Sequence, residues 1–97
     1  MVKKTNDELL LTSKIVVARN INDNVIAARV MWKQESRFLE LTYYLNQEPT
    51  DTEEDHCELA VGELIGEFNE IISANCSCVY LRDDSKIDHM EGLVFRK

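Results

Sequence analysis

The sequence predicts an α+β domain in which a four-stranded antiparallel sheet packs on one central amphipathic helix, in the order α-β-β-α-β-β. Residues 51–72 repeat apolar side chains at helical spacing, whereas residues 25–33 and 38–45 follow the two-residue period of strands. The chain of 97 residues is long enough for one domain, 1–97, with a small core.

The first segment, Asp7 to Arg19, has two interpretations. Thr5 and Glu8 stand at capping-box spacing, which favours the start of a helix. The apolar residues that follow spread widely around a helical wheel, and residues 15–17 suit a strand equally well. The residue pattern leaves both structures open.

Residues 20–24 are rich in Asn and Asp, which is typical of a turn, and the next two segments predict a hairpin. A short polar turn at residues 34–36 separates them, so the two strands should be antiparallel. On the sheet we expect burial of Trp32, Leu39, Leu41, Tyr43 and Leu45, in contact with Leu64 and Phe68 of the central helix.

The start of the central helix is marked by Pro49, which ends the preceding strand, and by Thr50 and Glu53 at capping-box spacing. Acidic residues crowd its first turns, where the helix dipole favours negative charge. Its predicted apolar arc holds Cys57, Ala60, Val61, Leu64, Ile65, Phe68, Ile71 and Ile72. Residues 76–82 and 92–96 predict the last two strands, with a polar loop at 83–91.

The acidic residues are concentrated in the middle of the chain. The formal net charge is −7, and between Arg37 and Arg82 there are ten Asp or Glu residues but no Lys or Arg. This asymmetry argues against nucleic acid as a direct ligand and favours a basic partner. The alternative is a solvated helix face that only keeps the protein soluble.

The residues that could carry chemistry do not form a known motif. Three cysteines, Cys57, Cys76 and Cys78, suit reduced thiols in the cytoplasm, and their spacing does not match a zinc signature. The only histidines, His56 and His89, are not near an arrangement typical of an activated nucleophile. We therefore expect no enzyme activity, no metal and no cofactor, and, without an apolar run of membrane length, no membrane partner.

Residues 30–97 combine several short words: a strand with Trp near its end (VMWK), an aromatic-rich strand (LELTYYLNQEPT), an acid-started helix (DTEEDHCELAVGELIGEF) and a basic ending (EGLVFRK). This combination resembles the small acidic immunity proteins of bacterial polymorphic-toxin and contact-dependent growth inhibition systems. The resemblance implies a helix before the first strand. It also implies a cytoplasmic, non-catalytic protein that neutralises the C-terminal catalytic domain of a cognate toxin, in many cases a nuclease with a basic cleft.

Two other functions remain open on the sequence. A phage-encoded acidic inhibitor, similar to an anti-CRISPR protein or a nucleic-acid mimic, would have a similar charge. A small hydrolase would use His56 and neighbouring acids. For the binding function, the outward Leu59, with Gly62 and Gly66 nearby, makes the outer side of the central helix the candidate surface. The predicted partner-binding residues are Asp51, Glu54, Asp55, Glu58, Leu59 and Glu63 on that helix, with Asp83 and Asp84 of the polar loop.

Overall fold

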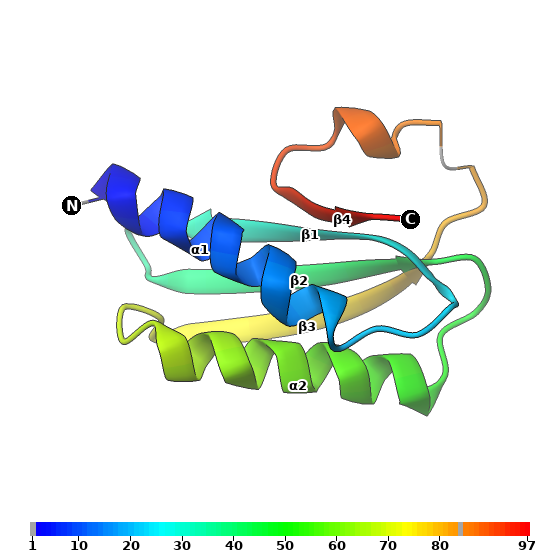
Figure 1. Ribbon diagram of the computed structural model, residues 1–97, viewed down its shortest axis with the longest axis horizontal. Helices are drawn as coiled ribbons and strands as arrows, with labels where there is room; N and C mark the ends of the chain where they lie inside the picture. Colours follow the sequence, from blue (N-terminus) through cyan, green and yellow to red (C-terminus); the bar gives the residue numbers. More distant parts are fainter. Residues whose placement is uncertain (1, 84) are drawn as a thin grey trace.

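The computed structural model describes residues 2–83 and 85–97. Its elements are α1 (Val2–Ala18), β1 (Val25–Lys33), β2 (Phe38–Leu45), α2 (Asp51–Glu67), β3 (Ser73–Tyr80), the 3-10 helix η1 (Ile87–His89) and β4 (Leu93–Arg96). The four strands form one sheet in the order β3-β2-β1-β4 (Figure 1). The predicted α+β class and the order of the elements are confirmed.

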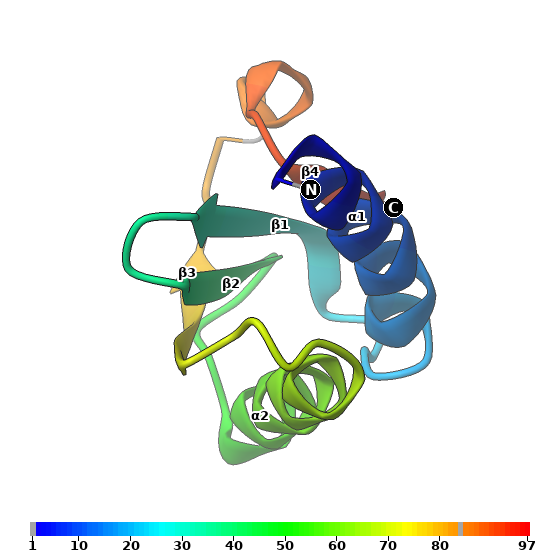
Figure 2. The ribbon, with the colours of Figure 1, turned by 90° about the vertical axis from the view of Figure 1, so that its left-hand side faces the viewer.

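The two helices cover one face of the sheet, and η1 packs on the other (Figure 2). Helix α1 lies over β1 and β4, whereas α2 lies over β2 and β3. The main core lies between the helices and the sheet, and a smaller cluster of Ala27, Tyr44 and Ile87 lies under η1. The outer side of α2 therefore faces away from the sheet.

The segment that the sequence left ambiguous is a helix, and α1 begins at Val2, before the expected start at Thr5. Leu9, Val16 and Val17 are buried against the sheet, while Leu11 and Ile15 are exposed on the opposite side. Apolar residues on both sides of α1 explain why the wheel showed no single apolar face.

The predicted hairpin of β1 and β2 is confirmed, with antiparallel pairing from Val25 with Leu45 to Lys33 with Phe38. The four β2 residues expected in the core, Leu39, Leu41, Tyr43 and Leu45, are buried, as is Leu64 of α2. Trp32 and Phe68 are only partly buried at the margin of this core. The Trp32 indole N–H donates to Gln34 Oε1 at 2.9 Å, which keeps this side chain near the surface.

The sheet is mostly antiparallel, but it is mixed, because β3 runs parallel to β2. Seventeen helical residues span about 25 Å and eight strand residues about 26 Å, so α2 carries the chain back to the starting end of β2. The next strand then begins beside Phe38, with Ser73 as its partner, and must run in the same direction. The expectation of a wholly antiparallel sheet was wrong on this point.

Helix α2 is shorter than predicted and β3 starts earlier. The helix ends at Glu67, and Phe68 has an extended backbone with φ −126° and ψ 102°. The Ile72 N–H donates to the Arg37 carbonyl at 2.9 Å, so the backbone here pairs with the start of β2. Ile72, which was placed on the apolar arc, is 71% exposed. The chain therefore leaves the helix after Glu67 and pairs with the start of β2, although the apolar repeat in the sequence continues to Ile72.

The turn before β4 requires glycine at position 92. Gly92 has φ +76°, and a Cβ atom there would lie 2.1 Å from the carbonyl oxygen of Val30. The Gly92 carbonyl accepts from the Val30 N–H at 2.9 Å, so this turn holds β4 against β1.

We expect Gly92→Ala to lower the free energy of unfolding by at least about 2 kcal/mol, because the strained φ and the backbone clash add together. The control is Gly62→Ala in the middle of α2, where nothing lies within 4 Å of the added Cβ. That variant should gain up to about 1 kcal/mol from helix propensity. Urea denaturation measures both, and equal effects of the two substitutions would contradict this account.

Candidate functional site

The first turn of α2 is held by Glu53, whose side chain is only 1% exposed. The Thr50 backbone N–H donates to Glu53 Oε1 at 2.7 Å, which completes the predicted capping box. Asn22 Nδ2 and Asn24 Nδ2 donate to Glu53 Oε2 at 2.8 and 3.2 Å. One carboxylate thus joins the loop after α1 to the start of α2.

The Glu53 carboxylate remains ionised despite its burial. Burial alone would raise the pKa of this carboxyl, but the hydrogen bonds from Asn22, Thr50 and Asn24 outweigh it and lower the pKa to about 2. Glu53 therefore stabilises the fold and, unlike the exposed acids of α2, is not available to a partner.

The outer face of α2 consists of the exposed residues Asp51, Glu54, Asp55, Glu58 and Leu59. Leu59 is 58% exposed in the middle of these acids. A shallow groove of about 550 Å³ is lined by Asp55, Glu58, Leu59, Gly62 and Glu63. The structure therefore brings four of the predicted residues together around one groove, and Gly62 leaves its floor open.

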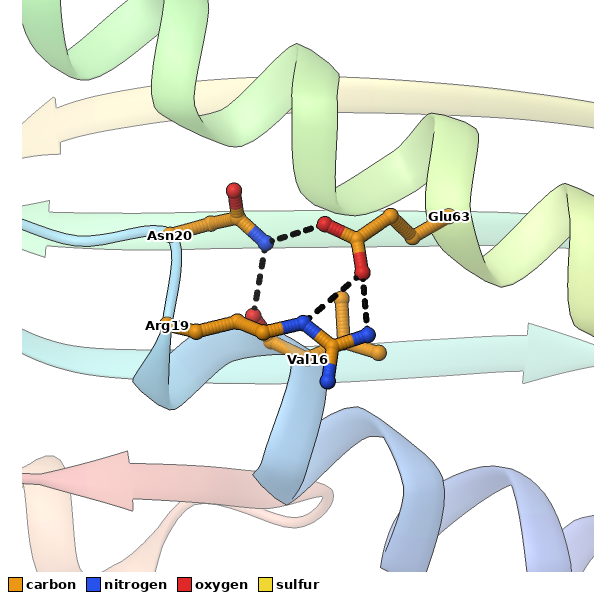
Figure 3. Close-up of polar contacts among 4 residues, drawn as sticks. All are labelled: Val16, Arg19, Asn20 and Glu63. Carbon is orange, nitrogen blue, oxygen red and sulfur yellow. Dashed lines mark hydrogen bonds and ion pairs between the residues drawn. The ribbon is translucent and has the colours of Figure 1, made fainter.

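Glu63 borders this groove but is already bonded within the chain (Figure 3). Arg19 donates to Glu63 Oε1 through Nε at 2.9 Å and through Nη2, and Asn20 Nδ2 donates to Oε2 at 2.8 Å. These hydrogen bonds, with the positive charge of Arg19, hold the pKa of the Glu63 carboxyl below its usual range. Glu63 connects α2 to the end of α1, so its charge is largely compensated.

The two predicted loop residues are not part of the groove. Asp83 is exposed, and its Oδ1 accepts from the Ser85 N–H at 3.0 Å, which lowers the pKa of this carboxyl. The next described element after β3, η1, packs on the face of the sheet opposite α2 (Figures 1 and 2). Asp84 lies outside the described residues.

A second groove, which the sequence did not suggest, lies between α2 and β3. It has a volume of about 280 Å³ and is lined by Glu54, Glu58, Cys76, Ser77 and Cys78. The four-residue spacing of Glu54 and Glu58 and the alternation of the two cysteines are visible in the sequence. Only the sheet order, which places β3 at an edge below α2, brings them together.

The three thiols lie near one another in the core region below this groove. The Cys57 Sγ–H donates to the Leu41 carbonyl at 3.8 Å. Burial raises the pKa of the Cys57 thiol well above its usual value and that of Cys78 to about 11, so both remain protonated at neutral pH. Within residues 2–83 and 85–97, no three His, Cys, Asp or Glu side chains are arranged to hold a metal ion.

His56, the residue that a hydrolase would use, lies half-buried on α2. Its Nδ1 atom is buried and makes no hydrogen bond to the described part of the chain. A general base is normally oriented by such a bond, and none is present at this atom.

The profile of the MafI2 immunity protein family matches residues 6–97. The chain belongs to the MafI2 immunity protein family. No curated protein matches this sequence. The family confirms the resemblance to immunity proteins of polymorphic toxins and suggests a toxin-neutralising protein with a toxin as its partner.

In this MafI2 family member, the outer face of α2 combines four exposed acids, Asp51, Glu54, Asp55 and Glu58, with the exposed side chain of Leu59. None of the described helices is both long and apolar enough to span a bilayer. The charge pattern and the groove at Leu59 make the outer face of α2 the candidate site of protein recognition.

The low pKa of Glu53 predicts a specific dependence of stability on pH. Its contribution is fully present above the usual carboxyl pKa of 4.5 and is lost as the pH falls toward about 2. Between pH 4.5 and about pH 2, we expect the free energy of unfolding to fall less steeply with pH in Glu53→Gln than in the wild type. At neutral pH this variant should lose about 2 kcal/mol, because its charge-assisted hydrogen bonds are weakened.

Urea denaturation at stepped pH measures this effect. The matched control is Glu58→Gln, which changes an exposed carboxylate on the same helix and should keep the wild-type slope. The same pH slope in the wild type and both variants would show that Glu53 is not the group responsible.

Proposed function

We propose that this protein neutralises the C-terminal catalytic domain of a cognate toxin, a nuclease, by placing the outer face of α2 against its basic substrate cleft. The observation that carries the proposal is the groove at Leu59, where Asp55 and Glu58 flank an exposed apolar side chain. No Lys or Arg occurs between Arg37 and Arg82 to offset these acids. Membership of an immunity protein family supports a toxin as the partner.

The mechanism is binding alone, in the cytoplasm of the producing cell, without a catalytic residue, metal or cofactor. Opposite potentials attract the two surfaces before contact and raise the association rate. After contact, Leu59 leaves water and acts as an anchor, while the surrounding acids pair with basic groups of the cleft. Occupation of the cleft then excludes the nucleic-acid substrate.

The acids of α2 contribute unequally to this mechanism. Asp51, Glu54, Asp55 and Glu58 are exposed, so their charge faces a partner directly. Glu63 is bonded to Arg19 and Asn20, so it holds the two helices together at the border of the site. The proposal therefore assigns the attractive potential to the first two turns of α2.

We expect the triple variant Glu54→Lys, Asp55→Lys and Glu58→Lys to bind the toxin domain about 10- to 100-fold more weakly, mainly through slower association. The reason is that the variant replaces the attractive potential with a repulsive one. Surface plasmon resonance at several salt concentrations measures the rates, and growth of cells that express the toxin measures protection.

The matched control reverses three exposed acids elsewhere, Glu8, Glu35 and Glu91, and so changes the net charge by the same amount. It should retain binding and protection. If the α2 variant folds, as judged by circular dichroism, and binds with unchanged affinity at every salt concentration, the outer face of α2 is not the site.

Leu59 provides an independent test of the anchor. Leu59→Ala should weaken toxin binding by about 1–2 kcal/mol, mostly through faster dissociation, while the stability of the free protein changes by no more than about 0.5 kcal/mol. Leu11→Ala removes an equally exposed leucine from α1 and should leave affinity unchanged. Isothermal titration calorimetry compares the two, and an equal loss for both would refute an anchor at Leu59.

A further inference from the structure

Strand β3 is an unprotected edge of the sheet. At the other edge, β4 has only four residues, ends in Arg96 and pairs with β1 through a register shift. By contrast, β3 has eight residues, SANCSCVY, without a charge, proline or glycine, and it pairs with β2 in an unbroken register from Ser73 to Tyr80. Edge strands usually carry a charge, a proline or a bulge that prevents pairing with another chain, and β3 has none of these.

The backbone groups on the open side of β3 can be assigned from its hydrogen bonds. The Leu81 N–H donates to the Leu45 carbonyl at 2.9 Å, so residue 81 faces β2. Because successive residues turn their backbone groups to opposite sides, Ser77 and Val79 also face β2. The Cys57 Sγ atom lies 3.8 Å from the Leu41 carbonyl oxygen of β2 and 3.9 Å from the Ser77 carbonyl oxygen of β3. The Ser77 carbonyl is therefore on the side of β3 that faces β2, which agrees with this assignment. The N–H and C=O groups of Ala74, Cys76, Cys78 and Tyr80 therefore point to the open edge.

The open edge is flanked by negative charge and by exposed apolar side chains. Glu54 and Glu58 of α2 line the groove of about 280 Å³ beside Cys76 and Cys78. Figure 2 shows β3 at the border of the sheet, with α2 below it, and none of the described strands lies on its outer side. Ile72, directly before the strand, is 71% exposed.

We propose that β3 pairs with an extended segment of the toxin, which adds a strand to the sheet and directs Lys or Arg side chains into the groove toward Glu54 and Glu58. This inference rests on the proposed function and specifies that the toxin binds through an extended basic segment. Every second side chain of an added strand would face α2, so a basic residue at alternate positions reaches the two carboxylates.

The charge of the groove argues for a basic segment and against a second copy of this chain. Two copies joined edge to edge through antiparallel β3 strands would form a continuous sheet with both α2 helices on one face. Glu54 and Glu58 of one copy would then approach the same carboxylates of the other. Like charges in such a position oppose association, whereas Lys or Arg side chains neutralise them.

The test is hydrogen exchange by NMR on the free protein and on its complex with the C-terminal domain of its cognate toxin. In the free protein the N–H groups of Cys76 and Cys78 should exchange fast, and those of Ser77 and Val79 slowly. In the complex we expect the exchange of Cys76 and Cys78 to slow at least 10-fold, because these N–H groups become hydrogen-bonded.

A pair of variants tests the same backbone group by affinity. Cys76→Pro removes an N–H that faces the open edge and leaves the hydrogen bonds to β2 in place, and Cys76→Ala removes the same thiol but keeps the N–H. The proline variant should bind the toxin domain at least 10-fold more weakly than the alanine variant. If proline prevents folding, the exchange measurement on the wild-type protein decides alone.

The outcomes separate the two proposals. A complex that forms with unchanged exchange at Cys76 and Cys78 overturns the strand pairing and leaves the proposed function in place. No complex with the toxin domain at all overturns the proposed function and the strand pairing with it. In the free protein, hydrogen exchange at Cys76 and Cys78 could instead slow as the protein concentration rises. That result would assign the edge to a second copy of this chain and overturn the proposal of a basic segment.

Discussion

The buried carboxylate of Glu53 is the interaction on which the site depends. It accepts hydrogen bonds from Asn22, Asn24 and Thr50, residues that come from the loop after α1 and from the turn before α2. These contacts fix where α2 begins and how it is rotated on the sheet. Because each helical residue turns by 100°, the rotation at Glu53 determines which later acids face solvent and which face the core. A buried charge is tolerated here only because its lone pairs are occupied by donors.

The rotation of α2 divides chemically similar side chains into separate roles. Glu53 points inward and holds the helix start, Glu63 points sideways to Arg19, and Glu54 and Glu58 remain exposed. Acids that lie close together in the sequence therefore face different directions on the folded helix and do not form one continuous acidic surface. The charge that a partner would meet comes from the first two turns, where the helix dipole already favours carboxylates and lowers the penalty of concentrating them.

Glu58 links the two grooves that flank α2. It lines the groove at Leu59 on the outer side of the helix and also the groove above the edge of β3. A single toxin surface that covered Leu59 and extended a strand along β3 would contact Glu58 from both sides. The two proposals thus describe neighbouring parts of one continuous surface, with an apolar anchor at one end and backbone hydrogen bonds at the other.

Local patterns in the sequence determined α2, the strands and their order, the capping box of Thr50 and Glu53, the outward Leu59 and the resemblance to immunity proteins, but they left α1 open between helix and strand. The periods of helices and strands and the spacing of a capping box extend over only a few residues, so they can be read from the chain directly. Tertiary structure decided the parallel direction of β3, the early end of α2 and the pairing of Glu63 with Arg19. Those features depend on hydrogen bonds between distant segments, such as Arg19 with Glu63, which are 44 residues apart. No local spacing encodes such a contact, because it exists only after the sheet has brought the segments together.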